Sequence, residues 1–282
     1  MKYTILALVT IFILTLEAQA GAVRIGLIPG NGHEMKDKAE QFASLLSKQI
    51  KKDVSIFIPD NYQGLVTAMS EKRVDFAFFT AMSFVYAEKE ANAKVLLKSV
   101  WDNPYYFSTI VSHPDSEIHS LADLKGKKIA FVDTKSTSGF LMPSLKLKQA
   151  GLDYQEVFSG NHKASVEKLM KREVDAIAVF ANDDKASKGA WNVYFDKGHF
   201  QPKVLWVSQP LPTDPFTVRE DFYKENQELT YDVMFALMDM PKLAGKTNLL
   251  YETLGVKKLI TANTAQYRAV KKLVKQLELK QN

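Results

Sequence analysis

Residues 128–143 read KIAFVDTKSTSGFLMP, and this stretch decides the fold. The pattern predicts an apolar strand over 128–132 and a helix over 139–150, ended by Gly151. Ser136, Thr137 and Ser138 stand with Gly139 between the two. A helix start beside three hydroxyls offers free N–H groups to a phosphate-like anion. The residues alone favour a plainer interpretation, in which Ser138 is an ordinary N-cap within a polar loop.

The same alternation of strand and helix extends on both sides of this stretch. Uninterrupted apolar strands separated by helices are typical of parallel sheets that are covered on both faces. The C-terminal part from Arg219 onward is predicted to be mostly helical. The pattern predicts strands over 23–28, 54–58, 74–79 and 176–180, and helices over 35–50, 65–69, 229–238 and 267–279.

An internal similarity links two segments that lie about one hundred residues apart. Residues 69–77 read MSEKRVDFA, and residues 170–178 read MKREVDAIA. In each, a helix ends in basic residues and a Val-Asp turn begins a buried strand. Two interpretations stay open: a common helix-turn-strand pattern that recurs by chance, or two similar α/β lobes.

Composition excludes several classes of protein. The 282 residues carry a net charge of +5, 46% hydrophobic content and no Cys, so disulfides, thiolate metal sites and a Cys nucleophile are excluded. The five His form neither an HxxxH nor an HExxH pair, which argues against a zinc site. The basic residues are scattered, which suits a small anionic ligand better than a nucleic acid. We therefore expect no bound metal and no nucleic-acid partner.

The first twenty residues are predicted to be a secretory signal peptide. A Lys near the start precedes an uncharged run of about 14 residues, and a small-x-small site ends at Ala20. That run is shorter than the roughly 20 residues that a bilayer span needs. We expect cleavage near Ala20 and export of a soluble chain to a bacterial periplasm.

Residues 123–143 resemble the periplasmic phosphate, phosphite and phosphonate-binding proteins of ABC transporters. Further segments resemble that family in the same order: YQGLVTAM at 62–69, YYFS at 105–108, SGNH at 159–162 and PLPTDP at 210–215. Together they cover most of residues 23–219. The resemblance implies the type 2 periplasmic binding fold, with two lobes that are each a mainly parallel sheet flanked by helices.

The resemblance also implies how the chain is divided. Lobe 1 would comprise residues 21–107 and 208–282, and lobe 2 residues 108–207. Crossings near Ser108 and Val207 would form the hinge. We found no flexible linker rich in Pro, Gly or Ser between the lobes.

Carried over position by position, the resemblance implies a ligand site. The hydroxyls of Ser136, Thr137 and Ser138, with the N–H groups of Ser138 and Gly139, would bind the phosphoryl oxygens. His162 would add a ring donor, and Asp214 would approach a protonated oxygen or a ligand amine. Two tyrosines, Tyr62 and Tyr106, would close over the ligand. Without the resemblance, His162 as a helix cap and each Tyr as a core or rim residue remain alternatives.

One position departs from the family's pattern. Binders of aminophosphonates carry a second acid after the Val-Asp strand, whereas this chain has Asn182 there and Asp183 one residue later. Asp183 is a further candidate ligand residue, or else an acid at a solvated helix start. The departure puts 2-aminoethylphosphonate in doubt and leaves phosphate, phosphite, methylphosphonate or another phosphonate open.

The implied function is capture of a phosphorus oxyanion by hinge closure and delivery to a membrane permease. The chain would act as a monomer, without a cofactor and without catalysis. One alternative is a sensor that reports to a membrane histidine kinase. A second alternative is a phosphoester hydrolase, since residue types allow a Ser136–His162–Asp214 triad, although no GxSxG elbow is present.

Overall fold

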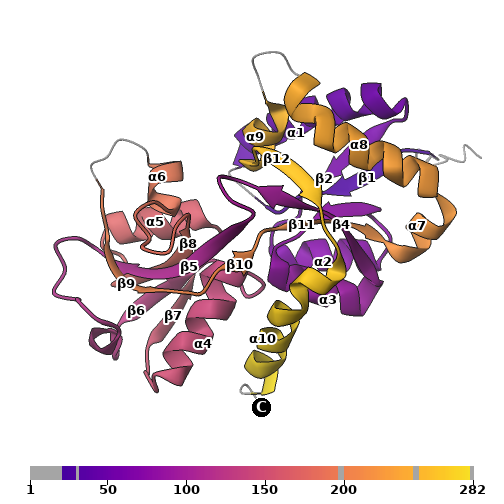
Figure 1. Cartoon of the computed structure of the whole chain (residues 1–282). Coiled ribbons are helices and arrows are strands. Elements are labelled where there is room, and N and C mark those ends of the chain that lie inside the picture. Colours follow the sequence, from indigo (N-terminus) through magenta and orange to yellow (C-terminus); the bar gives the residue numbers. More distant parts are fainter. Residues whose placement is uncertain (1–20, 30–31, 196–199, 244–247, 280–282) are drawn as a thin grey trace, which may run out of the picture.

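The computed structural model describes residues 21–29, 32–195, 200–243 and 248–279. These residues form two β-sheets, each with helices packed on it, in two bodies that lie side by side (Figure 1). This confirms the predicted α/β class with two lobes. The expected signal peptide, residues 1–20, lies outside the described residues. No helix in the described part of the chain has the length and apolar character needed to cross a membrane.

The first sheet has the strand order β12-β4-β11-β3-β1-β2. Its strands are β1 (Val23–Gly26), β2 (Val54–Phe57), β3 (Phe76–Phe78), β4 (Ala93–Val100), β11 (Pro215–Arg219) and β12 (Lys258–Thr261). One face carries α1 (Gly32–Ile50), α8 (Gln227–Leu243) and α9 (Leu249–Leu254), and the other carries α2 (Tyr62–Ser70) and α3 (Ala81–Ala91) (Figure 1). The short α7 (Glu220–Glu225) precedes α8.

The second sheet has the order β10-β5-β8-β6-β7, with β9 also paired to β5. Its strands are β5 (Tyr105–Ser112), β6 (Lys128–Phe131), β7 (Gln155–Phe158), β8 (Ala176–Ala181), β9 (Lys203–Val207) and β10 (Leu211–Pro212). Its helices are the 3₁₀ turn η1 (Leu121–Leu124), the π-helical turn η2 (Thr137–Leu141), α4 (Met142–Gln149), α5 (His162–Met170) and α6 (Ala190–Tyr194).

Strand pairing is mixed, which corrects the expectation of mainly parallel sheets. β1 pairs in parallel with β2 and β3, and β6 pairs in parallel with β7 and β8. β4, β11 and β12 pair antiparallel, as does β5 with β8, β9 and β10. Parallel neighbours require a helical crossover, whereas β5 and β11 enter their sheets directly from the other one.

The chain passes between the sheets twice. Residues 101–104 connect β4 to β5, and residues 213–214 connect β10 to β11. Ser108 lies within β5 and Val207 ends β9, so both expected crossings lie inside the second sheet. The chain stays in that sheet up to Pro212 because β10 pairs with the start of β5.

The internal similarity is structural. Asp75 accepts the Arg24 N–H at 3.1 Å and donates its own N–H to the Arg24 carbonyl at 2.8 Å. Asp175 does the same with Lys128, at 2.8 and 2.9 Å. Each Val-Asp turn thus fixes its strand to the parallel neighbour, β3 to β1 in the first sheet and β8 to β6 in the second. The helix before each turn also begins in the same way. Its N-cap is an Asn, which is Asn61 in the first lobe and Asn161, one hundred positions later, in the second.

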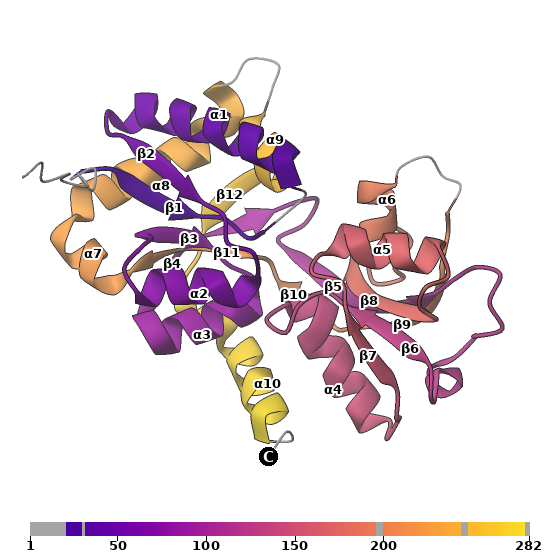
Figure 2. The ribbon, with the colours of Figure 1, turned by 180° about the vertical axis from the view of Figure 1, so that it is seen from behind.

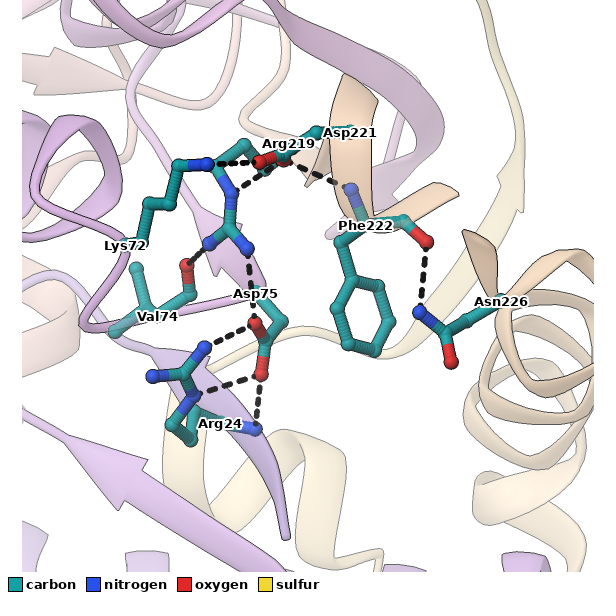
Figure 3. A network of polar contacts seen from close by, with 8 residues as sticks. All are labelled: Arg24, Lys72, Val74, Asp75, Arg219, Asp221, Phe222 and Asn226. Atoms are coloured by element: carbon teal, nitrogen blue, oxygen red, sulfur yellow. Dashed lines mark hydrogen bonds and ion pairs between the residues drawn. The ribbon is translucent and has the colours of Figure 1, made fainter. Parts of the chain in front are cut away.

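In the part of the chain that the structure describes, only the first lobe builds an ion-pair network on this turn. Figure 3 shows the Asp75 carboxylate between Arg24 and Arg219. Arg219 also donates to the Val74 carbonyl and to Asp221. Asp75 is 1% exposed, so the paired guanidinium groups stabilise its buried charge.

One buried apolar cluster joins the two bodies. It contains Phe84 of α3, Phe131 of β6 and Phe140 of η2. The last helix, α10 (Arg268–Leu279), adds Val270 and its neighbours to the same cluster. Figure 2 shows α10 beside α3, on the side that faces the second body. The C-terminal helix therefore packs at the junction of the two halves.

Candidate functional site

The three consecutive hydroxyl residues form a buried turn at the end of β6. Ser136 is the N-cap of η2, and its Oγ accepts the Gly139 N–H at 3.0 Å. A Cβ at Gly139 would lie 2.4 Å from Val132 Cγ2, which is why this position is glycine. The helix was predicted to begin at Gly139, but the chain first makes a π-helical turn from Thr137. Such turns inside helices are frequent at functional sites.

The first lobe meets this turn through the N-terminus of α3. The Met82 N–H donates to Thr137 Oγ1 at 2.8 Å, and Thr80 Oγ1 donates to the Lys135 carbonyl at 2.8 Å. Ser108 Oγ donates to the Ser138 carbonyl at 2.7 Å from β5. Backbone and hydroxyl groups from both lobes therefore converge on the triplet.

Tyr106 lies beside the triplet, and Tyr62 contacts the segment just before it. Tyr106 is buried and hydrogen-bonds the side chains of Thr137 and Ser138. Tyr62 begins α2, and its N–H donates to Asp133 Oδ2 at 3.2 Å, from the second lobe. Burial raises the pKa of both tyrosines, so each stays a neutral hydroxyl that can donate a hydrogen bond.

Asp214 approaches the same place from the connection between β10 and β11. Its charge contributes to the raised pKa values of both Tyr62 and Tyr106, which places its carboxylate near their hydroxyls. Burial raises the pKa of Asp214 itself to about 7, because the charged form has lost water. Near neutral pH this carboxyl group can therefore either donate or accept a proton.

His162 begins α5 in the second lobe, at the position that Tyr62 has in α2. Its Nδ1 is buried and has no hydrogen-bond partner among the described residues. Burial lowers the pKa of His162 to about 3, so the imidazole is neutral. Its ring lies edge-on to Phe180 at 4.9 Å, and Phe180 is 6.4 Å from Tyr194. A row of rings thus leads from His162 to Tyr194, whose phenol contributes to the raised pKa of Tyr62.

Asp183 does not share this arrangement, which corrects its prediction as a ligand residue. Its carboxylate accepts the N–H groups of Lys185, Ser187 and Lys188 and the Ser187 hydroxyl, at 2.6–3.1 Å. These donors come from its own loop and use the capacity of both oxygens. The Asn182 N–H pairs with the Lys188 carbonyl at the base of that loop.

The structure adds residues that the sequence did not suggest. Tyr194, Asp133 and Tyr267 come from α6, from the loop after β6 and from the C-terminal 3₁₀ turn η3 (Thr264–Tyr267). Tyr194 and Tyr267 belong to no motif that the sequence analysis singled out. Asp133 lies within the family-like stretch 123–143, one residue after the predicted strand, but no role was assigned to it.

The residue types of a catalytic triad are present without its hydrogen bonds. Ser136 Oγ is engaged by the Gly139 N–H, and within the described residues neither His162 nor the Asp214 carboxylate has a hydrogen bond. A triad needs His to contact both the nucleophile and the orienting acid. The described ranges also hold no group of three or more His, Asp or Glu side chains placed to bind a metal.

Comparisons with known proteins agree with one another. Residues 25–267 match the family model described as ABC transporter, phosphonate, periplasmic substrate-binding protein. The phosphonates-binding periplasmic protein of Escherichia coli is 27% identical over 77% of this chain and 66% of its own length. The phosphate-import protein PhnD of Mycolicibacterium smegmatis is 28% identical over 73% and 68%.

A solved structure supports the fold. PhnD1 from Prochlorococcus marinus, in complex with methylphosphonate, superposes with a TM-score of 0.76 at 22% identity. The superposition covers 91% of this chain and 98% of that one. The match over nearly the whole of both chains shows that the two share their fold.

Proposed function

The chain belongs to the periplasmic substrate-binding proteins of phosphonate ABC transporters, and we propose that it binds a small phosphorus oxyanion between its lobes for delivery to a permease. The ligand would be a phosphonate, phosphite or phosphate. The E. coli and M. smegmatis relatives carry phosphonate and phosphate in their names, which supports this range.

The observation that carries the proposal is a set of neutral donors that surround one acid, Asp214. Ser136, Thr137 and Ser138 are each at most 2% exposed, yet they stand at a helix start, where N–H groups favour an anion. Asp214 and His162 add an acid and a buried ring nitrogen that have no partner among the described residues. A protonated oxyanion would satisfy both sides, because it offers acceptor oxygens and an acidic hydroxyl.

Closure would bring the two lobes onto the ligand. The connections at 101–104 and 213–214 are the proposed hinge, because they alone carry the chain between the sheets in the described residues. Tyr62, Thr80 and Met82 of the first lobe already contact the 133–137 segment of the second. A ligand favours this form through groups that only the closed form brings together.

Calorimetric titration with phosphate, phosphite, methylphosphonate, ethylphosphonate and 2-aminoethylphosphonate tests the proposal. Replacing Ser136 and Thr137 together with Ala should weaken binding by about 2–4 kcal/mol, since hydrogen bonds to a charged oxygen are lost. Ser116→Ala with Thr261→Ala is the matched control, because both hydroxyls lie elsewhere. Equal binding by the two double variants would remove the site assignment.

The remaining roles need separate assays. Incubation with a phosphomonoester distinguishes receptor from hydrolase, because a receptor binds stoichiometrically without turnover. Capture of the loaded protein on an immobilised permease, compared with a histidine-kinase periplasmic domain, distinguishes transport from sensing. Sedimentation tests the proposed monomer, and mass spectrometry of periplasmic material tests cleavage near Ala20.

A further inference from the structure

The connection that carries Asp214 is held from both sides by the first lobe. The Ser99 N–H, at the end of β4, donates to the Asp214 carbonyl at 2.9 Å. The Tyr267 hydroxyl donates to the carbonyl of Thr213 at 2.7 Å. One hydrogen bond therefore fixes each of the two peptide planes next to Asp214.

Tyr267 reaches this connection from the far end of the chain. It is 1% exposed and ends the turn that precedes α10, and its ring packs edge-on against Phe84 at 5.3 Å. Burial, and after it the nearby Asp214 carboxylate, raise the pKa of its hydroxyl. Tyr267 thus stands directly behind the acid of the proposed ligand site.

We propose that Tyr267 is the positioning residue that sets Asp214 for the ligand, an inference that rests on the proposed function. Asp214 stands in a two-residue connection at the hinge, with a carboxylate that has no hydrogen-bond partner among the described residues. Its direction is therefore determined by the adjoining peptide planes. The Tyr267 hydroxyl fixes the peptide plane between Thr213 and Asp214. It is not itself among the groups that are proposed to contact the ligand.

The hydroxyl and the ring of Tyr267 have separable tasks. The ring, with Val270, Val274 and Leu277, anchors α10 in the buried cluster. The hydroxyl's hydrogen bond is to Thr213. Removing only the hydroxyl oxygen of Tyr267 leaves the packing of its ring in place and frees the 213–214 connection from its hydrogen bond.

A double-mutant cycle in affinity tests this. Methylphosphonate and phosphite are titrated by calorimetry into the wild type, Tyr267→Phe, Asp214→Asn and the double variant. Tyr267→Phe should weaken binding about three- to tenfold, as expected for one lost hydrogen bond. In the Asp214→Asn background the same change should cost less than twofold, because there is no longer a carboxylate to position.

Tyr154→Phe is the matched control. It removes a tyrosine hydroxyl that bonds Glu156 on the second lobe, and affinity should stay at the wild-type value. Phe84→Leu perturbs the packing of the Tyr267 ring and should lower thermal stability while leaving affinity within twofold.

Several results would overturn the proposal. An equal loss of affinity from Tyr267→Phe with and without Asp214 would show a general structural role, and so would unfolding of Tyr267→Phe at 25 °C. Unchanged affinity of Tyr267→Phe in a wild type that binds would refute positioning and leave the proposed function standing. A wild type that binds none of the five oxyanions would instead refute the proposed function.

Discussion

Two buried titratable groups in the site should oppose each other in the pH dependence of stability. Asp214 has its pKa raised by burial from 3.8 to about 7, and His162 has its pKa lowered by burial from 6.5 to about 3. The folded protein therefore holds the Asp214 proton more tightly than the unfolded chain does, and the His162 proton less tightly. Between pH 3.8 and 6.5 each group therefore holds a different number of protons in the folded and the unfolded state.

The sign of each group's contribution to stability follows from the linkage between proton binding and folding. The Asp214 contribution is fully present below pH 3.8 and is lost as pH rises toward 7. The His162 contribution is fully present above pH 6.5 and is lost as pH falls toward 3. Each changes the free energy of unfolding by up to about 1.4 kcal/mol per pH unit, in opposite directions. Both residues keep part of their surface exposed, so these values are upper limits, and in the wild type the two slopes cancel.

Single variants should expose each slope. Urea denaturation of the ligand-free protein from pH 4.0 to 6.5 gives the free energy of unfolding of wild type, Asp214→Asn and His162→Gln. Relative to wild type, Asp214→Asn should gain stability with rising pH, by up to about 3.5 kcal/mol over the range. His162→Gln should lose a similar amount.

The double variant is the control, because both slopes are removed and its difference from wild type should be flat. Taking differences also removes the acids elsewhere, such as Asp221, whose pKa is lowered to about 2. Flat curves for both single variants, or slopes of the same sign, would refute the burial of these two groups.

Three other changes test separate parts of the structure. Asp75→Asn should lower the free energy of unfolding by about 3–5 kcal/mol in chemical denaturation, because it leaves two guanidinium groups without their buried partner. Gly139→Ala should cost about 1–3 kcal/mol and weaken ligand binding, since its Cβ would overlap Val132; intact binding in calorimetry would contradict that. Lys135→Met should weaken binding about two- to fivefold, because the ammonium lies 3.5 Å above the Tyr86 ring across the lobes; an unchanged dissociation rate in stopped-flow would count against it.

Local patterns predicted the parts of the fold that local physics determines. The stretch at 128–143 contains its own strand, cap and helix start, and the repeated Val-Asp turn contains the hydrogen bonds that fix it. The antiparallel strands were missed, because β11 pairs with β3 and β4 more than one hundred residues away. The predicted strand over 74–79 is shortened to 76–78 because Asp75 is occupied with the turn.

Local sequence patterns also predicted only part of the candidate site. Tyr62, Tyr106 and the triplet carry recognisable neighbours in sequence, whereas Tyr194 and Tyr267 reach the site only through tertiary packing. Asp183 failed in the opposite way: its residue type suited a ligand, but its own loop supplies four donors to its carboxylate. A carboxylate's availability depends on hydrogen bonds that the linear sequence does not display.

The repeat places one ring-bearing residue at the start of a helix in each lobe. Tyr62 and His162 are both the first residue of a helix whose Asn cap lies immediately before it, in units one hundred residues apart. Side chains at a helix start lie at the carboxyl edge of the preceding strand, where open α/β sheets bind ligands. Two such edges that face each other supply donors from both sides. In the proposed site the repeated unit therefore supplies one ring from each lobe, the phenol of Tyr62 and the imidazole of His162.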